Sequence, residues 1–558
     1  MISIVKKFCL FLAFTLIMTL VTACNDSSSG RNTPESSSTI PQGDETVKEG
    51  PSWTWDTTPV KLTWFVDQDW YKKTWDIQNC LLDKKITEET GVTIEITSGN
   101  GDKFNALIAS DSLPDIVSTW IGSSQRQVLE KNKMVLPFNE LVANYAPDFK
   151  VPQSMQDWFR NEDGNYYGYV NYFYAPEEMQ EGNYYVTHNN FRIRKDIADK
   201  LGIKVSDFDT KEGTLEALRK VRDSKIQYNG LDIIPFYPCA GTRDLLLDVQ
   251  YLAQQFGAAY EDAEGNWLDW RMQPETLEAL KFYNTLYHEE LMPTDAVTLK
   301  IEQKGAKVAN GSVFMIQGRQ VENQWNELES RDENAVYLLV GPIRGDEGKT
   351  PYLTTSGLTG WTMTMITKNA KRPDRAVRFL NYMTQPENIL QTWWGPEGVT
   401  WDMVDGHVVI KPEVEEEYKK DWAAANLKYG DKTFEWLVSW LPIQRTYPIA
   451  TKQYVIDNEK YEKEVYGKYV FDDKCFSDIT VEAGTEEAGI YEKSNTYWIS
   501  QVAKIIVADP GDVTMMYHEA VEKSKELGWQ KFYDATNARF KGNKAKLGIE
   551  FAYPPNMK

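Results

Sequence analysis

The sequence is poor in cysteine, in histidine and in basic residues. Among 558 residues there are five cysteines and four histidines, and 61 lysines and arginines stand against 82 aspartates and glutamates, a net charge of −21. A chain this acidic has no basic face large enough for a phosphate backbone, which excludes nucleic acid as a partner. The four histidines also lie too far apart for a catalytic zinc motif: His188, His288, His407 and His518.

Recognisable catalytic motifs are missing as well. The sequence contains no GxSxG, no P-loop and no GxGxxG followed by a helix, which argues against serine hydrolases and nucleotide-dependent enzymes. We therefore expect no enzymatic activity and no cofactor. A surface-anchored glycoside hydrolase remains an alternative, because folding can bring two of the many carboxylates together as acid and nucleophile.

Long hydrophobic runs are absent except at the N-terminus. Residues 8–21 form an apolar run behind Lys6 and Lys7, which has the length of an export signal and is short for a membrane span. The run ends in VTAC, which resembles the bacterial lipobox. We predict that residues 1–23 are a lipoprotein signal peptide and that Cys24 carries a palmitate-containing lipid anchor. A plain secretory signal with an incidental cysteine is the alternative.

The segment after the signal has hardly any apolar residue. It is rich in Ser, Thr, Pro, Gly and Glu and cannot bury enough surface to fold, so residues 24–58 are predicted to be the lipidated cysteine and a flexible tether. Few cysteines and a Ser-rich tether suggest the outer face of a Gram-positive cell membrane. Beyond the tether at most one disulfide is possible, and buried thiols are expected at Cys80, Cys239 and Cys475.

Strand and helix patterns alternate in the body of the chain. Residues 60–66 alternate as a strand, residues 77–90 form a helical pattern that stops at Gly91, and residues 92–96 form a second strand. This order predicts a parallel sheet in an α/β domain, and the length favours two domains. Further predicted elements are a strand over 115–118, helices over 104–110, 214–222, 277–288, 374–384 and 386–394, a helix running into a strand over 306–317, and a mostly helical stretch over roughly the last 150 residues.

Seven short motifs follow one another along residues 21–401. They are VTAC (21–24), DQDW (67–70), EETGV (88–92), LIASDSLPDI (107–116), IRKDIADKLG (193–202), ITKNAKRPDRAV (366–377) and WGPEGVTW (394–401). Together they resemble the extracellular solute-binding lipoproteins, family 1, of carbohydrate ABC importers, in the long Gram-positive branch. After about residue 405 only the length and the helical character agree with that family.

The resemblance implies two α/β lobes of the class II periplasmic-binding-protein-like fold with a hinge between them. It implies an N-terminal lobe over residues 59–175 plus 336–402 and a more helical C-terminal lobe over residues 176–335 plus 403–558. An oligosaccharide would bind in the cleft and be delivered to the ABC permease at the extracellular face of the membrane. We expect a monomer. A peptide-binding protein or an adhesin is the remaining alternative.

Many relatives carry a calcium loop of alternating oxygen ligands after a helix of the second lobe. In this sequence Lys225 and Ile226 stand where carboxylates would be needed. We therefore predict no metal ion at this loop.

Candidate ligand-binding residues are flat aromatic side chains for the apolar face of a sugar ring and charged groups for its hydroxyls. Four of them follow predicted strands, where open α/β sheets bind ligands: Asp67, Asp69, Trp70 and Trp120. By the resemblance, Tyr172 and Tyr174 lie where the chain first crosses between the lobes, Trp361 lies after a Gly/Ser/Thr loop at the return into the first lobe, and Arg243 and Arg319 occupy loops that face the cleft. Trp394 and Glu397 belong to the WGPEG motif. Each candidate has an alternative role: core packing for the aromatic residues, a solvated loop charge for the aspartates and a surface ion pair for the arginines. For Trp394 and Glu397 the alternative is a tight turn that holds the hinge. The candidates are Asp67, Asp69, Trp70, Trp120, Tyr172, Tyr174, Arg243, Arg319, Trp361, Trp394 and Glu397.

Overall fold

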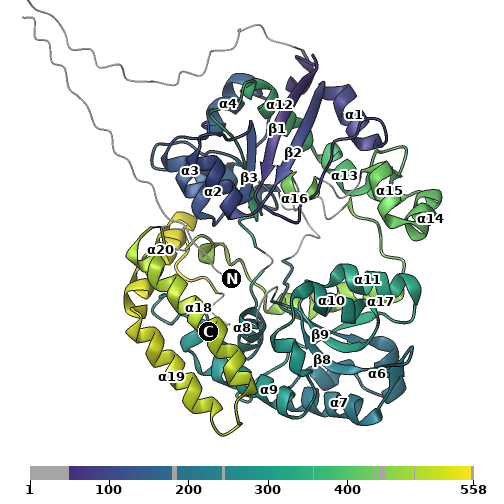
Figure 1. Ribbon diagram of the computed structural model, residues 1–558, viewed down its shortest axis with the longest axis vertical. Helices are drawn as coiled ribbons and strands as arrows, with labels where there is room; N and C mark the ends of the chain where they lie inside the picture. Colours follow the sequence, from purple (N-terminus) through teal and green to yellow (C-terminus); the bar gives the residue numbers. More distant parts are fainter. Residues whose placement is uncertain are drawn as a thin grey trace, which may run out of the picture. The chain divides into compact units, whose positions relative to one another are not determined.

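Two mixed sheets, each covered by helices, organise the part of the chain that the computed structural model describes (Figure 1). These residues belong to one unit, 46–558. The described ranges are 49–178, 185–241, 245–355, 357–430, 434–438, 446–479, 481–482 and 484–553.

The first sheet has the strand order β2-β1-β3-β11-β4. Strand β1 is parallel to β2 and β3, whereas β11 runs antiparallel to β3 and β4. Apolar side chains fill both faces of β1, as a sheet covered by helices on both sides requires. The strands are β1 (Val60–Val66), β2 (Val92–Ser98), β3 (Ile116–Trp120), β4 (Tyr169–Val170) and β11 (Thr362–Ile366).

The second sheet has the order β10-β5-β9-β8. Strands β8 and β9 are parallel, and the other two pairs are antiparallel. Its side chains belong to a buried cluster that extends into α9, α18 and α19. The strands are β5 (Phe191–Arg194), β8 (Ile234–Pro238), β9 (Val313–Gln317) and β10 (Tyr337–Val340).

The helices follow the two sheets. We call the first sheet with its helices the N-terminal lobe: α1 (Leu81–Thr90), α2 (Gly101–Ala109), α3 (Ser124–Lys131), α4 (Phe138–Tyr145), α5 (Gln153–Phe159), α12 (Pro373–Met383), α13 (Pro386–Trp394), α14 (Pro412–Lys420), α15 (Trp422–Tyr429) and α16 (Glu435–Val438). We call the second sheet with its helices the C-terminal lobe: α6 (Lys195–Leu201), α7 (Lys211–Ser224), α8 (Leu246–Gln255), α9 (Pro274–His288), α10 (Ile301–Ala309), α11 (Glu322–Arg331), α17 (Gln453–Glu464), α18 (Glu486–Val507), α19 (Val513–Glu526) and α20 (Trp529–Leu547). Two small hairpins complete the lobes, β12 (Trp401–Val404) with β13 (His407–Ile410) and β6 (Gln227–Tyr228) with β7 (Leu231–Asp232).

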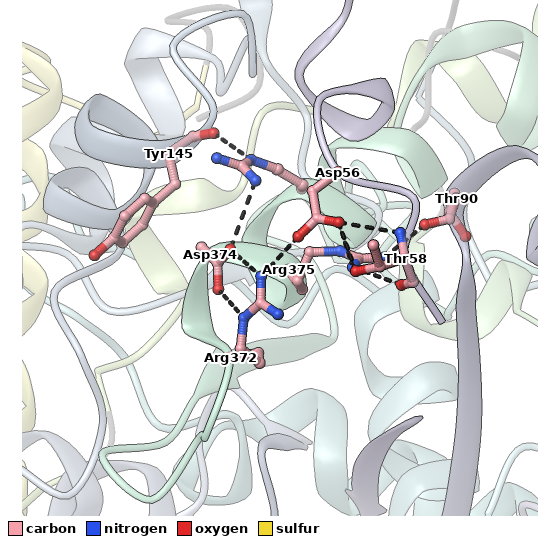
Figure 2. Close-up of polar contacts among 8 residues, drawn as sticks. Asp56, Thr58, Thr90, Tyr145, Arg372, Asp374 and Arg375 are labelled. Atoms are coloured by element: carbon pink, nitrogen blue, oxygen red, sulfur yellow. Dashed lines mark hydrogen bonds and ion pairs between the residues drawn. The ribbon is translucent and has the colours of Figure 1, made fainter. Parts of the chain in front are cut away.

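A polar cluster fixes the segment before β1 to the start of α12 (Figure 2). The buried guanidinium of Arg375 donates to the carbonyl oxygens of Thr58 (2.8 Å) and Thr90 (2.7 Å). Arg372 donates to the Asp56 carboxylate at 2.8 Å. Hydrogen bonds from Thr58 and then from Arg372 hold the pKa of Asp56 well below its usual range. The residues just before β1 are therefore part of the folded lobe.

The prediction of a flexible tether over residues 24–58 is wrong at its C-terminal end. Ser52 is fully buried, its N–H donates to Asp148 (3.0 Å), and its hydroxyl accepts from Asn381 (2.9 Å). The ring of Trp53 packs edge-on against Tyr382. Composition missed this anchoring because the partners, Asp148 after α4 and Asn381 and Tyr382 of α12, lie far along the sequence.

Two predicted lobe boundaries also differ from the structure. Strand β10 lies within the range predicted for the N-terminal lobe but pairs with β5 in the second sheet. Helices α15 and α16, predicted for the C-terminal lobe, pack on the N-terminal lobe: α15 contacts α1, and α16 contacts β4 and β11. The reason is apolar packing, since the ring of Phe434 lies 6.1 Å from that of the fully buried Trp64.

Other expectations are confirmed. Cys80, Cys239 and Cys475 are buried free thiols, and burial raises the pKa of each. The stretch from α14 onwards is mainly helical. Searched over the described ranges alone, the chain has no helix with the length and apolar character needed to cross a membrane.

Candidate ligand-binding site

Three tryptophans lie at one end of the first sheet. Trp70 and Trp120 are each 50% exposed, and Trp70 stacks on Trp361 with ring centroids 6.1 Å apart and planes 12° from parallel. Trp361 directly precedes β11, whose first residue, Thr362, pairs with Trp120 of β3. We call Trp70, Trp120 and Trp361 the tryptophan edge.

Local backbone geometry positions each ring of the tryptophan edge. The ring of Trp120 lies close to Gly122, where a Cβ atom would be only 3.0 Å from the ring. The indole N–H of Trp70 donates to the side-chain oxygen of Gln68 at 3.0 Å. Gly360 has φ +86°, and a Cβ at this position would lie 2.3 Å from the carbonyl oxygen of Asn171. Only glycine therefore lets the chain before Trp361 approach β4 so closely.

Asp67 follows β1 at the same edge. Its backbone N–H donates to the carbonyl oxygen of Ser118 at 2.9 Å, and its carboxylate accepts from the hydroxyl of Thr119 at 2.8 Å. Partial burial raises the pKa of this carboxyl. Asp67 is thus a half-buried acceptor held by Thr119, the residue before Trp120, whereas Asp69 has an exposed side chain.

Tyr172 and Tyr174 lie where the chain leaves the first sheet. Both side chains are partly exposed, and Tyr172 has a positive φ of 51°. The ring of Tyr174 lies 5.1 Å from that of Tyr185, and the ammonium of Lys474 lies 4.8 Å from it. Tyr174 therefore contacts the C-terminal lobe.

Asn171 is a residue of this edge that sequence reasoning missed. It is fully buried, and its side-chain oxygen accepts from the backbone N–H groups of Trp361 (3.1 Å) and Thr362 (2.7 Å). An amide between the aromatic residues 169 and 172–174 was the available signal. The role of Asn171 depends on Trp361 and Thr362, which lie far away in the sequence and contact it only in the fold.

Arg319 follows β9 in the C-terminal lobe. Its guanidinium donates to the Glu322 carboxylate at 3.2 Å and lies 3.9 Å from that of Glu462. Burial and then the charge of Arg319 lower the pKa of His188 to about 4. Arg319 therefore forms the ion pair that was its alternative role, with Glu322 as the nearer partner. Arg243 lies outside the described residues.

Trp394 and Glu397 lie apart from the tryptophan edge. Trp394 packs against Tyr447 and Trp393, with ring centroids 5.1 and 5.9 Å away, in a small cluster around the buried Trp401. Glu397 is exposed in the turn that brings the chain back to Trp401, whose indole N–H donates to the carbonyl oxygen of Gly395 at 2.8 Å. The hinge-turn alternative accounts for these contacts.

Within the described residues, no group of three or more His, Cys, Asp or Glu side chains is placed to bind a metal ion. After α7, residues 225–232 form the β6–β7 hairpin. The absence of calcium at this position stays a prediction.

Two lobes built on separate sheets, with exposed aromatic rings at the end of one sheet, define a class of ligand-binding proteins. The chain belongs to the bacterial extracellular solute-binding protein family, whose model matches residues 81–389. This confirms the family that the sequence motifs indicated. No curated protein matches the sequence.

Many solved structures share the fold. The FusA substrate-binding protein of an ABC transporter of S. pneumoniae, in complex with kestose, is 16% identical with a TM-score of 0.65, covering 87% of this chain and 100% of that one. An extracellular solute-binding protein of Bifidobacterium longum subsp. infantis has the same identity and TM-score, with coverages of 87% and 98%. The alginate-binding protein AlgQ2 without calcium ion is 18% identical with a TM-score of 0.63, covering 88% and 99%. These matches confirm the two-lobed α/β fold.

Proposed function

We propose that this protein is the lipid-anchored extracellular substrate-binding protein of a carbohydrate ABC importer, which captures an oligosaccharide between its lobes and delivers it to the permease. The observation that carries the proposal is the tryptophan edge. Family membership supports the class of protein, and the kestose complex of FusA supports the class of ligand.

The chemistry of the edge suits a neutral sugar chain. A pyranose has an apolar face of C–H bonds, which packs on a flat indole, and a rim of hydroxyls, which donate to carboxylates. Trp120 is half exposed, and the half-buried carboxylate of Asp67 bonds Thr119, the preceding residue of β3. Trp70 and Trp361 are stacked on each other and present a second aromatic surface at the same end of the sheet. More than one platform favours an oligosaccharide over a monosaccharide.

Capture follows from the two lobes. A ligand that contacts both lobes stabilises the conformation in which they are closed, by its difference in affinity for the closed and open forms. Tyr174, Arg319 and Arg243 remain candidates for the contacts of the second lobe. The closed form would be the one that the permease recognises.

Anchoring rests on the sequence alone. The VTAC segment and Cys24 lie outside the described residues. Mass spectrometry of the protein purified from its own membrane would identify a lipid on an N-terminal Cys24. A chain that retained residues 1–23, or that began after Cys24, would contradict the anchor without affecting the ligand proposal.

A thermal-shift screen against plant and microbial oligosaccharides tests the ligand. A sugar at 100 times its dissociation constant adds about 2.7 kcal/mol to the free energy of unfolding, which raises the melting temperature by a few degrees. A shift with the sugar recovered intact supports a receptor. Shortened sugar would make the protein a glycoside hydrolase, and a shift with peptides alone would make it a peptide-binding lipoprotein.

Substitution of the edge then locates the site. Trp120→Ala should weaken oligosaccharide binding roughly tenfold, because a half-exposed platform is lost, and should leave the melting temperature of the free protein nearly unchanged. Trp422→Ala is the matched control, since Trp422 is 54% exposed at the start of α15 and lies outside the edge. Equal affinities for both variants would remove Trp120 from the site.

A further inference from the structure

A cavity of about 270 Å³ lies within the C-terminal lobe, separate from the tryptophan edge. Its walls come from α8, from residues 260–271, from residues 476–479, and from the C-terminal helices α18 and α20. None of its lining residues belongs to the N-terminal lobe. The cavity therefore cannot be part of the tryptophan edge.

Aromatic rings form much of the wall. Tyr491 of α18 stacks on Phe532 of α20 with centroids 5.3 Å apart and planes at 29°. Trp267 meets Phe532 edge-on at 5.9 Å, and Tyr260 lies 5.3 Å from Phe476. Rings held by each other in this way are rigid, so the cavity keeps its shape without a ligand.

The charge in the cavity is balanced. Asp269 and Arg271 are both buried and make two hydrogen bonds to each other, at 2.9 and 2.8 Å, and Trp529 donates to the same carboxylate at 2.9 Å. No other charged side chain lines the cavity. A ligand with a net charge would find no counter-ion, so the site suits a neutral molecule.

The cavity also offers a polar group that the protein leaves unbonded. The side-chain amide of Asn495, on the partly exposed side of the wall, makes no hydrogen bond to another described residue. The hydroxyl of Thr536 has no partner either among the described residues, but it is buried out of reach of a water-sized group and cannot contact a ligand in the cavity. A hydroxyl group of a ligand can donate to the amide oxygen of Asn495 or accept from its amide N–H.

Size limits the ligand. An engineered cavity of about 150 Å³ holds one benzene ring. The present cavity is larger, so it has room for one six-membered ring that carries substituents. We propose that this cavity is a second ligand site that binds a single neutral, hydroxylated ring, a free pyranose, independently of oligosaccharide capture at the tryptophan edge.

The test is a ligand-observed NMR titration of the purified protein with D-glucose, D-galactose and D-mannose, up to roughly 50 mM because a single ring with few hydrogen bonds binds in the millimolar range. Asn495→Trp should fill the mouth of the cavity and abolish pyranose binding. Thr496→Trp is the matched control, because Thr496 is the exposed next residue of the same helix and does not line the cavity. Trp120→Ala should bind the pyranose like the unmodified protein.

Asn495→Leu gives a second measurement that does not depend on a bulky side chain. It keeps the size of the residue and removes the amide, so pyranose binding should weaken roughly two- to tenfold, the loss of one hydrogen bond. The melting temperature should not fall, because the amide bonds no other described residue in the free protein.

Three results would overturn the proposal. They are binding of no pyranose, retention of pyranose binding by Asn495→Trp, and loss of it in Trp120→Ala. Binding of benzene without binding of any pyranose would also overturn it, since the cavity would then be an apolar void. Oligosaccharide thermal shifts measured on Asn495→Trp distinguish the two sites. They should equal those of the unmodified protein, because the tryptophan edge is unaltered in this variant.

Discussion

At the scale of single residues, Asp473 is an acid held in a costly environment. It is 7% exposed, and its carboxylate accepts from the backbone N–H and the hydroxyl of Thr355, at 2.9 and 2.7 Å. Burial raises its pKa to about 6 in spite of these hydrogen bonds. The neighbouring charge of Asp472 acts in the same direction.

This carboxyl should make stability depend on pH. Its pKa is about 6 in the folded protein and about 3.9 in the unfolded chain, so the folded protein binds more protons between these values. The stabilisation is complete below about pH 4 and is lost as pH rises through 6, by up to about 3 kcal/mol at 1.4 kcal/mol per pKa unit. Asp473→Asn should remove this decline, which urea unfolding from pH 4 to 7 measures.

The control for this experiment is Asp472→Asn, which changes the adjacent carboxyl, 43% exposed at its side chain. It should keep the decline. The same slope in the Asp473→Asn protein and in the unmodified protein would contradict the assignment to Asp473.

At the scale of elements, α17 completes the edge of the second sheet. The side chain of Asn458 accepts from the backbone N–H of Leu339 at 2.8 Å and donates to the carbonyl oxygen of Tyr337 at 2.9 Å. The amide of Asn458 thus bonds the backbone groups of β10 that a further strand of the sheet would otherwise pair with. This pairing protects an edge that would otherwise be open to association.

Asn458→Ala should therefore lower the free energy of unfolding by roughly 2 to 4 kcal/mol, because two buried backbone groups lose their partner. Urea unfolding measures this difference. Lys460→Ala, at an exposed position of the same helix, should change the free energy by less than about 0.5 kcal/mol. Similar effects of the two substitutions would show that α17 covers β10 without bonding it.

Local patterns predicted several elements of the first sheet, but not β5, β8 and β10 of the second sheet. Alternation gave β1 at residues 60–66, and the proline at the start of α13 with its apolar spacing gave residues 386–394, as the structure has them. The helix predicted to run into a strand over 306–317 is confirmed as well, since α10 ends at Ala309 and Gly311 turns the chain into β9.

The candidate site was only partly predictable. Trp70 and Trp120 follow strands and could be proposed from position alone. Their association with Trp361 depends on the antiparallel pairing of β11 with β3, which no local pattern contains. The packing of Phe434 on Trp64 was missed for the same reason, and with it the true end of the N-terminal lobe.

At the scale of the whole molecule, ion pairs join the lobes in addition to the chain crossings. Arg126 of α3 is buried and lies 3.2 Å from Asp478 of the C-terminal lobe. Lys131 lies 3.1 Å from Glu482 in a more exposed pair. Lys546 of α20 donates to the carbonyl oxygen of Trp158. All three contacts connect α3 or α5 with the C-terminal part of the chain.

Asp478→Asn should loosen this connection, because it removes the charge opposite a buried guanidinium. We expect a larger radius of gyration for the ligand-free protein in small-angle X-ray scattering, and a return to the unmodified value when an oligosaccharide is bound. Glu482→Gln should have no measurable effect, since exposed ion pairs contribute little. An unchanged radius of gyration in Asp478→Asn would mean that the crossings alone set the spacing of the lobes.

The strand order of the first sheet also constrains how the protein is made. Strand β3 lies between β1 and β11, but β11 begins at Thr362. A chain synthesised from its N-terminus therefore cannot complete this sheet until residue 366 has emerged, about two thirds of its length. Until then the apolar edge of β3 is a target for aggregation. Such a high contact order predicts slow folding and a need for chaperones that keep the early part of the chain open while the rest is produced.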